Sequence, residues 1–512
     1  MAIIEQKASV IHPILFALFP ITFLFSQNVA QIYPIEAIIP GLLITAISII
    51  SWYGLGVISK NYFKSGLIIS TGIFLFFFYG HYYEFLVNIF VNTDISLGHK
   101  IPLISFVIIF SIIISFIIIT KKKLDNLTKI INAIVIVMVL LSVVNIASFY
   151  ILNSSEFTNN ELVKTDYFDS NLSYPNIYYI ILDGYGHNDY LKKYYNYDNS
   201  EFLSALENRG FFVPENPTSN YPATITSLTS LLNMEYNDKL VNENGIPNWL
   251  KFYEAAKNNK IMKYLNKHGY EIYNLDSGVY LTRHMPIADH NLCGTNFLIN
   301  SEFSTELFRI TMLKPVYGQI FETEGRERIN CAFTSLNEVH KEANNPFFIF
   351  AHIIAPHTPY LFGPNGEHVS PNDLEFGNNK SPKDIEGYIG QLQYVNKKIL
   401  ENVDNILENK ENNTIIVITA DHGTRYLLDW ECPLCSEEAI RERMAIFSAF
   451  YFYDKNYEEI DEDITLVNVF RNIFNTYVDG EFEILENHNY FIRNQTSLVF
   501  VDVTDITTSE ED

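Results

Sequence analysis

The sequence predicts an α/β protein in which a bundle of five transmembrane helices precedes a domain with a mostly parallel sheet, covered by helices on both faces. Residues 1–152 are very apolar and hold few acids, whereas the rest has the composition of an acidic globular protein. In that second part, short continuous apolar runs alternate with helical patterns, as in buried parallel strands joined by helices. We therefore expect a transmembrane domain at 1–152, a polar linker at 153–174 and an α/β domain at 175–512.

The apolar part contains five segments of membrane-spanning length. A helix needs about 20 mostly apolar residues to cross a hydrocarbon core about 30 Å thick. Buried helices of a soluble core rarely come five in a row with so little charge, and a cleaved signal peptide would explain the first segment at most. The expected spans are Val10–Val29, Glu36–Ile58, Ser65–Tyr83, Ile101–Thr120 and Ile130–Ile151.

The lysines next to these segments predict the orientation, because cytoplasmic loops carry an excess of Lys and Arg. If the five spans alternate, the short loops on one side hold only Lys100. The other side holds Lys7, Lys60, Lys64, Lys121, Lys122, Lys123 and Lys129. We expect a multi-pass protein of the cell membrane, with a cytoplasmic N-terminus and an extracytoplasmic α/β domain.

The net charge of −24 comes mostly from the α/β domain. It excludes nucleic acid as an expected partner, because nucleic-acid binding needs a basic face. All four cysteines, Cys293, Cys331, Cys432 and Cys435, lie in this part. The last two form a CPLC pair without the second pair or nearby histidines of a zinc ribbon. Outside the cytoplasm disulfides are the default, although the sequence leaves the pairing open.

The elements of the α/β domain follow from these patterns in chain order. Apolar runs predict strands, and amphipathic runs predict helices. The expected strands are Asn176–Asp183, Phe211–Val213, Tyr270–Asp276, Pro346–Ala355 and Thr414–Ala420, with a further apolar run at Ala445–Tyr453. The expected helices are Ser200–Arg209, Ala223–Asn233, 247–267, Ile385–Asn409 and Thr465–Tyr477. The stretch 277–345 matches no single pattern, and we interpret it as a lid or an insertion over the site.

Three buried strands end in groups that bind metals. Asp183 ends the first strand, His352 and His357 lie at the end of another, and Asp421-His422 follows TIIVITA. An Asp-His pair alone more often caps a loop than binds a metal. The carboxyl ends of parallel strands share one edge of the sheet, however, so we expect these groups to converge. Carboxylate oxygen with imidazole suits Zn²⁺ or Mn²⁺.

Thr224 is the candidate nucleophile, because it lies in the first turn of a helix that follows a proline. A helix N-terminus offers unpaired N–H groups and positive potential, which favour an alkoxide and a phosphate together. A metal held nearby would lower the pKa of the hydroxyl further. Ser219, Thr226 and Ser227 are rivals, and an ordinary helix-capping hydroxyl is the structural alternative.

These residues resemble those of the alkaline phosphatase superfamily, most closely its membrane branch of lipoteichoic acid synthases, phosphoethanolamine transferases and sulfatase-like proteins. The resemblance covers the whole chain. It implies an alkaline-phosphatase-like catalytic domain in which Asp183, Thr224, Asp421 and His422 hold one metal. The pattern Thr-x-x-Ser with an apolar residue next fits at Thr224–Leu228, and not at Ser219 or Thr226.

A second motif of the family, His-x(4)-His-x-Pro, matches His352–Pro359. The resemblance implies that His352 and His357 face the substrate or a second metal, and Arg425 is a further candidate for holding a phosphate. The histidine that phosphoethanolamine transferases carry about a dozen residues after Asp-His-Gly is missing from Thr424–Cys435. We therefore expect one essential divalent metal, Zn²⁺ or Mn²⁺ with Mg²⁺ and Ca²⁺ as alternatives, and leave a second metal open.

The resemblance implies a transferase that moves phosphoethanolamine or glycerol phosphate from a membrane phospholipid to a glycan or lipid acceptor. A phosphoric or sulfuric ester hydrolase is the first alternative, and an inactive membrane scaffold is the second. Sulfatases that use formylglycine make it from Cys or Ser within a Cys-x-Pro-x-Arg context. Position 224 is a threonine, and no Cys-x-Pro-x-Arg context surrounds it. "Sulfatase-like" therefore describes the expected fold more than the reaction.

Overall fold

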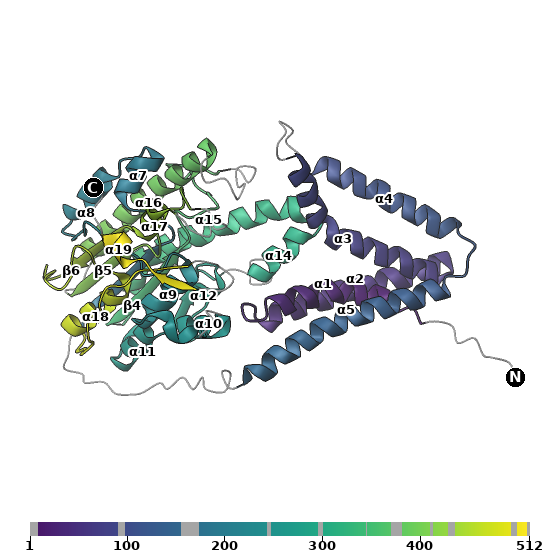
Figure 1. The fold of residues 1–512 in the computed structure, drawn as a ribbon, viewed down its shortest axis with the longest axis horizontal. Coiled ribbons are helices and arrows are strands. Elements are labelled where there is room, and N and C mark those ends of the chain that lie inside the picture. The colour runs from purple at the N-terminus through teal and green to yellow at the C-terminus, as the bar shows by residue number, and fades with distance from the viewer. Residues whose placement is uncertain are drawn as a thin grey trace. The chain divides into compact units, whose positions relative to one another are not determined.

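The computed structural model describes residues 9–90, 98–154, 174–242, 247–294, 301–344, 346–369, 381–409, 413–428, 436–492 and 499–508. The chain divides into two compact units, drawn as ribbons in Figure 1. The first unit contains Met1–Glu161 and Asn296–Phe321, and the second contains Leu162–Thr295 and Glu322–Asp512. Most of the expected linker, and both Cys432 and Cys435, lie outside the described residues.

Apolar helices form most of the first unit. They are α1 (His12–Gln27), α2 (Pro34–Ser59), α3 (Tyr62–Phe90), α4 (Lys100–Ile119) and α5 (Asp125–Leu152). The last four are long and apolar enough to cross a membrane, which confirms four of the five expected spans. Helix α1 has only 16 residues. At a rise of about 1.5 Å per residue it falls short of a core about 30 Å thick, so the count of five is not confirmed.

One helix of the first unit comes from much later in the chain. Helix α14 (Glu302–Ile310) buries Phe303 among apolar side chains of α1 and α3. Gly80 of α3 allows this close packing, because a Cβ atom there would lie 2.3 Å from the carbonyl oxygen of Arg309. Residues 296–321, which lie inside the stretch that matched no pattern, thus belong with the apolar helices and not with the α/β unit.

Helix α15 (Lys314–Glu338) follows α14 and continues into the second unit. A disulfide between Cys293 and Cys331, with a Cα–Cα distance of 5.6 Å, closes the loop that contains α14. Cys293 lies just before the segment that belongs to the first unit, and Cys331 lies after it, in the part of α15 that belongs to the second unit.

The second unit is built on a six-stranded sheet. Its strands are β1 (Asn176–Leu182), β2 (Glu271–Leu275), β3 (His290–Leu292), β4 (Phe347–Ile353), β5 (Thr414–Thr419) and β6 (Ser448–Phe452). Their order across the sheet is β3-β2-β4-β1-β5-β6. All neighbouring pairs are parallel except β5 and β6, which are antiparallel. The prediction of a mostly parallel sheet is confirmed.

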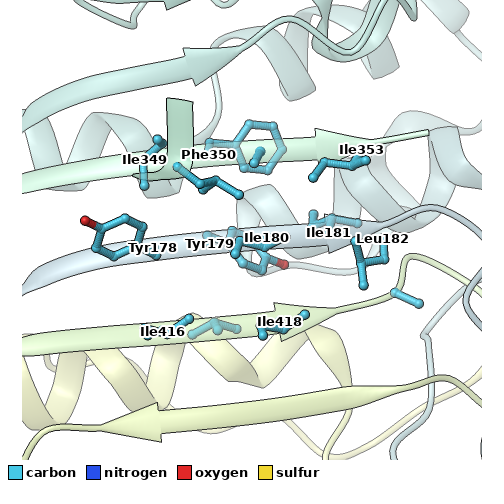
Figure 2. Close-up of a cluster of buried hydrophobic side chains, with 14 of the residues drawn as sticks. Tyr178, Tyr179, Ile180, Ile181, Leu182, Ile349, Phe350, Ile353, Ile416 and Ile418 are labelled. Atoms are coloured by element: carbon cyan, nitrogen blue, oxygen red, sulfur yellow. The ribbon is translucent and has the colours of Figure 1, made fainter. Parts of the chain in front are cut away.

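The three central strands are buried along their whole length. Figure 2 shows side chains of β1, β4 and β5 packed together in the core, among them Tyr179, Ile180 and Phe350. Because both faces of these strands are covered, their sequences are apolar at every position and do not alternate with polar residues. Expected strand Phe211–Val213 is reduced to a single bridge between Phe212 and Phe450.

Helices cover the sheet, and a two-stranded sheet of β7 (Tyr490–Ile492) and β8 (Phe500–Asp502) stands apart from it. The helix expected at 247–267 is two helices, because Asn259 caps the second one by accepting a hydrogen bond from the backbone N–H of Met262. The helices are α7 (Asn188–Tyr195), α8 (Ser200–Glu207), α9 (Thr224–Asn233), α10 (Trp249–Lys257), α11 (Lys260–Lys267), α12 (Tyr280–Arg283), α16 (Pro382–Asn409), α17 (Glu437–Met444), α18 (Leu466–Tyr477) and α19 (Thr504–Thr508), with 3₁₀ turns at Asn237–Leu240 and Val339–Lys341.

The register of the central strands brings their polar ends to one level. Ile181 of β1 pairs with His352 of β4 on one side and with Thr419 of β5 on the other. Asp183 and Asp421 each lie two residues beyond this level, so both leave the sheet at the same edge. The candidate site stands at this edge.

Candidate active site

The edge of the sheet holds a cluster of buried carboxylate and imidazole groups. Ligand atoms of Asp183, His352 and Asp421 all lie within 4.8 Å of one another, and all three residues are buried. His422 joins them, with its Nε2 atom 3.4 Å from Oδ2 of Asp421 and 3.6 Å from Oδ1 of Asp183. The ends of the three strands therefore converge, as the sequence predicts.

The nucleophile candidate lies against this cluster. Oγ1 of Thr224 is 3.2 Å from Nε2 of His422, and Nε2 of His352 is 3.6 Å from Oδ2 of Asp183. Tetrahedral ligands about 2.0–2.2 Å from a zinc ion stand roughly 3.3–3.6 Å apart. The spacing of these side chains therefore fits a shared divalent metal.

The cluster also contains polar atoms that a metal would satisfy. Oδ1 of Asp183, Oδ2 of Asp421 and Nε2 of His352 are buried, and none has a hydrogen-bond partner among the described residues. The other oxygen of Asp421 accepts hydrogen bonds of 3.0 Å from the backbone N–H groups of Gly184 and His422. A buried polar atom without a partner is costly, so three such atoms aimed at one point fit a cation with oxygen and nitrogen ligands.

The electrostatics of the cluster lead to the same conclusion. Burial raises the pKa of Asp421 to about 6, and the negative charge of Asp183 adds to the rise. Burial opposes ionisation of Asp183 as well, but the charge that His357 and the other histidines can carry outweighs it and lowers that pKa. Burial and the charge of Arg443 lower the pKa of His422. A divalent cation would allow both carboxylates to ionise beside a neutral imidazole.

The structure distinguishes Thr224 from its rivals. Thr224 is the first residue of α9 and is half-buried, so a substrate can reach it. The hydroxyls of the rivals are buried and are donated to backbone carbonyls. Ser219 bonds Tyr221, Thr226 bonds Ala223, and Ser227 bonds Asp421 at 2.6 Å. The last bond gives the Thr-x-x-Ser spacing a structural reason, because the serine holds the loop of Asp421 against the helix that carries the threonine.

The two histidines of the second motif have different surroundings. His352 is buried in β4 with its Nε2 atom toward Asp183. His357 is half-buried, its backbone N–H donates to the carbonyl of Asp183, and its Nδ1 atom bonds the carbonyl of Thr358 at 2.6 Å. Its ring lies 6.1 Å from the ring of His422, centre to centre. His352 thus belongs to the cluster of buried carboxylate and imidazole groups, whereas His357 lies beside it and is partly exposed.

Arg425 lies on the side of Asp384. Burial raises the pKa of Asp384, and the positive charges of Arg425 and His357 oppose that rise. Arg425 is half-buried. Both charges act on Asp384, so Arg425 and His357 lie near the same carboxylate.

Arg443 joins two loops of the site. Arg443 is buried, donates from Nε to the carbonyl of Pro222 at 2.6 Å and from Nη1 to the carbonyl of Gly423 at 2.9 Å. It therefore ties the loop before Thr224 to the loop after His422. The sequence carries no signal for this contact, because the two loops are far apart in the chain.

A family model described as Sulfatase matches residues 175–471, more than half of the chain. Among solved structures, the C-terminal periplasmic domain of EcEptC from Escherichia coli in complex with Zn is similar at 14% identity, covering 65% of this chain and 94% of that chain with a TM-score of 0.42. The integral membrane protein lipooligosaccharide phosphoethanolamine transferase A (EptA) from Neisseria meningitidis is similar at 11% identity, covering 92% of this chain and 96% of that chain with a TM-score of 0.40. No protein of curated function matches this sequence.

Proposed function

Because this chain belongs to the sulfatase family, and so to the enzymes of the alkaline phosphatase superfamily, we propose that it is a membrane-bound phosphotransferase with Thr224 as its nucleophile. The proposed reaction moves a phospho-head-group, phosphoethanolamine or glycerol phosphate, from a phospholipid to a hydroxyl of a glycan or lipid acceptor. The observation that carries the proposal is the position of the Thr224 hydroxyl, 3.2 Å from His422 in a cluster that fits a divalent metal.

The proposed ligands of one divalent metal, Zn²⁺ or Mn²⁺, are Asp183, Asp421, His422 and Thr224. His352 lies in the same cluster, with its Nε2 atom toward Asp183. The metal supplies positive charge that favours the alkoxide form of a bound hydroxyl. The N-terminus of α9 adds unpaired N–H groups beside Thr224, where a phosphoryl oxygen would lie. His352 is buried, so we assign the exchange of protons with substrate to His357.

In the first step Oγ1 of Thr224 forms a bond to phosphorus and the bond from phosphorus to the glycerol oxygen of the lipid breaks. The threonine proton ends on the released diacylglycerol, with His357 as its carrier. In the second step an acceptor oxygen forms a bond to phosphorus and the bond from phosphorus to Oγ1 of Thr224 breaks. The acceptor's proton passes by way of His357 to Oγ1, which restores the threonine hydroxyl. Arg425 is the proposed partner of the anionic head group.

Apolar helices suit this reaction, because a phospholipid donor lies in the membrane. Four helices are long enough to span it, and we propose that α1 is the fifth span. By the distribution of lysines the α/β domain then faces the outside. On the same basis we propose the division into residues 1–152, 153–174 and 175–512, except that residues 296–321 belong with the apolar helices.

Hydrolysis is the second candidate, since the matching family model is described as Sulfatase. Water would then replace the acceptor hydroxyl in the second step, and the first step would be the same. The two reactions differ only in what removes the group from Thr224. The product formed in the presence of an alcohol acceptor separates them.

The test is a comparison of Thr224→Ala with Thr224→Ser in the full-length protein, using phosphatidylethanolamine and phosphatidylglycerol vesicles as donors. We expect Thr224→Ala to lose turnover by at least about 10³-fold, and Thr224→Ser to keep part of it. Intact-mass measurement of the wild-type protein after incubation without acceptor should show the added group, and peptide mapping should place it on Thr224. Full turnover by Thr224→Ala, or an adduct on another residue, would refute the assignment.

A further inference from the structure

His352 differs from the other two histidines of the site in the partner of its Nδ1 atom. The Nδ1 atoms of His422 and His357 bond the carbonyl oxygens of Gly423 and Thr358. A carbonyl only accepts, so the proton in these two rings lies on Nδ1 and the lone pair lies on Nε2. The Nδ1 atom of His352 instead lies 2.8 Å from the hydroxyl of Thr282, which can donate or accept. Its tautomer therefore depends on where the Thr282 proton goes.

The Thr282 hydroxyl has a second partner, to which it can donate its proton. Its Oγ1 atom lies 2.6 Å from Oγ of Ser277, and both side chains are buried. The Ser277 hydroxyl in turn reaches the carbonyl of Val279 at 3.5 Å, which can only accept. The chain of donors can thus run from His352 to Thr282, to Ser277 and to a backbone carbonyl, with every proton used once.

We propose that Thr282 is a positioning residue of the metal site, which with Ser277 holds His352 in the tautomer that presents its Nε2 lone pair to the metal. The proposal rests on the proposed function in so far as the cluster of Asp183, His352 and Asp421 binds a metal. Nε2 is buried without a hydrogen-bond partner among the described residues, 3.6 Å from Asp183. A proton on Nε2 would occupy the place of the metal, so the hydroxyl pair selects for metal binding.

Thr282 is well placed for this role although it belongs to no motif. It lies in the short helix α12, 70 positions before His352 in the chain. The side chain of Asn274 in β2 donates to the Thr282 carbonyl at 3.4 Å, and Ser277 accepts from the backbone N–H of Val279 at 3.1 Å. These bonds fix α12 to the end of β2, and β2 pairs with β4, so the hydroxyl of Thr282 is held near the ring of His352.

The experiment is a zinc titration of the full-length protein in detergent, against a chromophoric chelator and without lipid. Loss of a hydrogen-bond partner behind a metal-binding histidine typically weakens metal affinity about 10- to 100-fold. We expect Thr282→Val to weaken zinc binding in this range, whereas Thr282→Ser keeps the hydroxyl and binds close to wild type. Thr465→Val is the matched control, because Thr465 is also buried and hydrogen-bonded, to Asn487, outside the site.

A double-mutant cycle separates positioning from a general loss of packing. In a His352→Ala background, Thr282→Val should have no further effect on the zinc dissociation constant. The proposal would be overturned if Thr282→Val bound zinc with wild-type affinity, or if its loss of affinity persisted without His352. It would also be overturned if Thr465→Val lost as much affinity, or if the wild-type chain bound no zinc. The titration needs no donor, so a chain with the expected zinc constants but no transfer refutes the proposed reaction and leaves this inference standing.

Discussion

Gly423 is the residue at which the smallest change should do the most damage to the site. A Cβ atom at this position would lie 2.3 Å from the carbonyl oxygen of Glu442, 2.4 Å from that of Ala445 and 3.0 Å from that of Arg443. All three obstacles are backbone atoms, which cannot swing aside as a flexible side chain would. Gly423→Ala therefore forces the loop that carries His422 away from α17.

The size of the displacement follows from these distances. The Glu442 oxygen and the new methyl group are 2.3 Å apart and must separate by about 0.7 Å to reach 3.0 Å, the shortest distance at which Cβ atoms are found in proteins. Catalytic groups need to be held within about 0.5 Å, and a misplacement of about 1 Å costs on the order of 10² in rate. Overpacking of this kind destabilises a core by about 1–3 kcal/mol. We expect a folded Gly423→Ala protein with turnover lowered by one to two orders of magnitude.

Gly390→Ala is the matched control. Gly390 lies in α16 of the same unit, and the nearest atom to its added Cβ would be 3.4 Å away, an ordinary contact. Alanine is also the better helix former. The assays are turnover, zinc affinity and the thermal midpoint of the full-length protein for both variants. Wild-type turnover and zinc affinity in Gly423→Ala would refute the reasoning, as would an equal loss in Gly390→Ala.

Two further predictions concern groups that hold the site together. Arg443→Met removes charged hydrogen bonds to the carbonyls of Pro222 and Gly423, each worth about 1.5–3 kcal/mol. We expect a lower thermal midpoint and at least about tenfold less turnover. Arg443→Lys should restore only part of both, because its ammonium group cannot span the two carbonyls. The raised pKa of Asp421, about 6, predicts zinc affinity that is flat above this pH and falls about tenfold per pH unit below it, because the metal must displace one proton. Zinc titrations between pH 5 and 8 check this, and a flat profile down to pH 5 would contradict it.

The central strands and the residues at their ends were predictable from the sequence, for a physical reason. A strand covered on both faces needs apolar side chains at every position, so β1, β4 and β5 stand out as continuous runs. Parallel neighbours end at one edge, so Asp183 and Asp421 had to meet once the strands were assigned.

Contacts between distant segments were not predictable. Nothing near Thr282 in the sequence indicates that its hydroxyl meets His352. Helix α14 is short and amphipathic, and such a helix fits equally well against a sheet or against other helices. Its place among the apolar helices depends on Gly80, which is unremarkable until a backbone approaches it. The break between α10 and α11 was missed because Asn259 acts as a cap in the middle of one continuous amphipathic pattern.

The surroundings of the cluster support our proposal of one essential metal. The ligand atoms of Asp183, His352 and Asp421 lie within 4.8 Å of one another, and this group contains both carboxylates of the strand ends. The loop after His422 is held against α17, because Glu442 accepts hydrogen bonds from the Thr424 hydroxyl and from the backbone N–H of Leu427. No histidine occurs between Thr424 and Cys435. We propose that His357 and Arg425 supply further positive charge to the transition state.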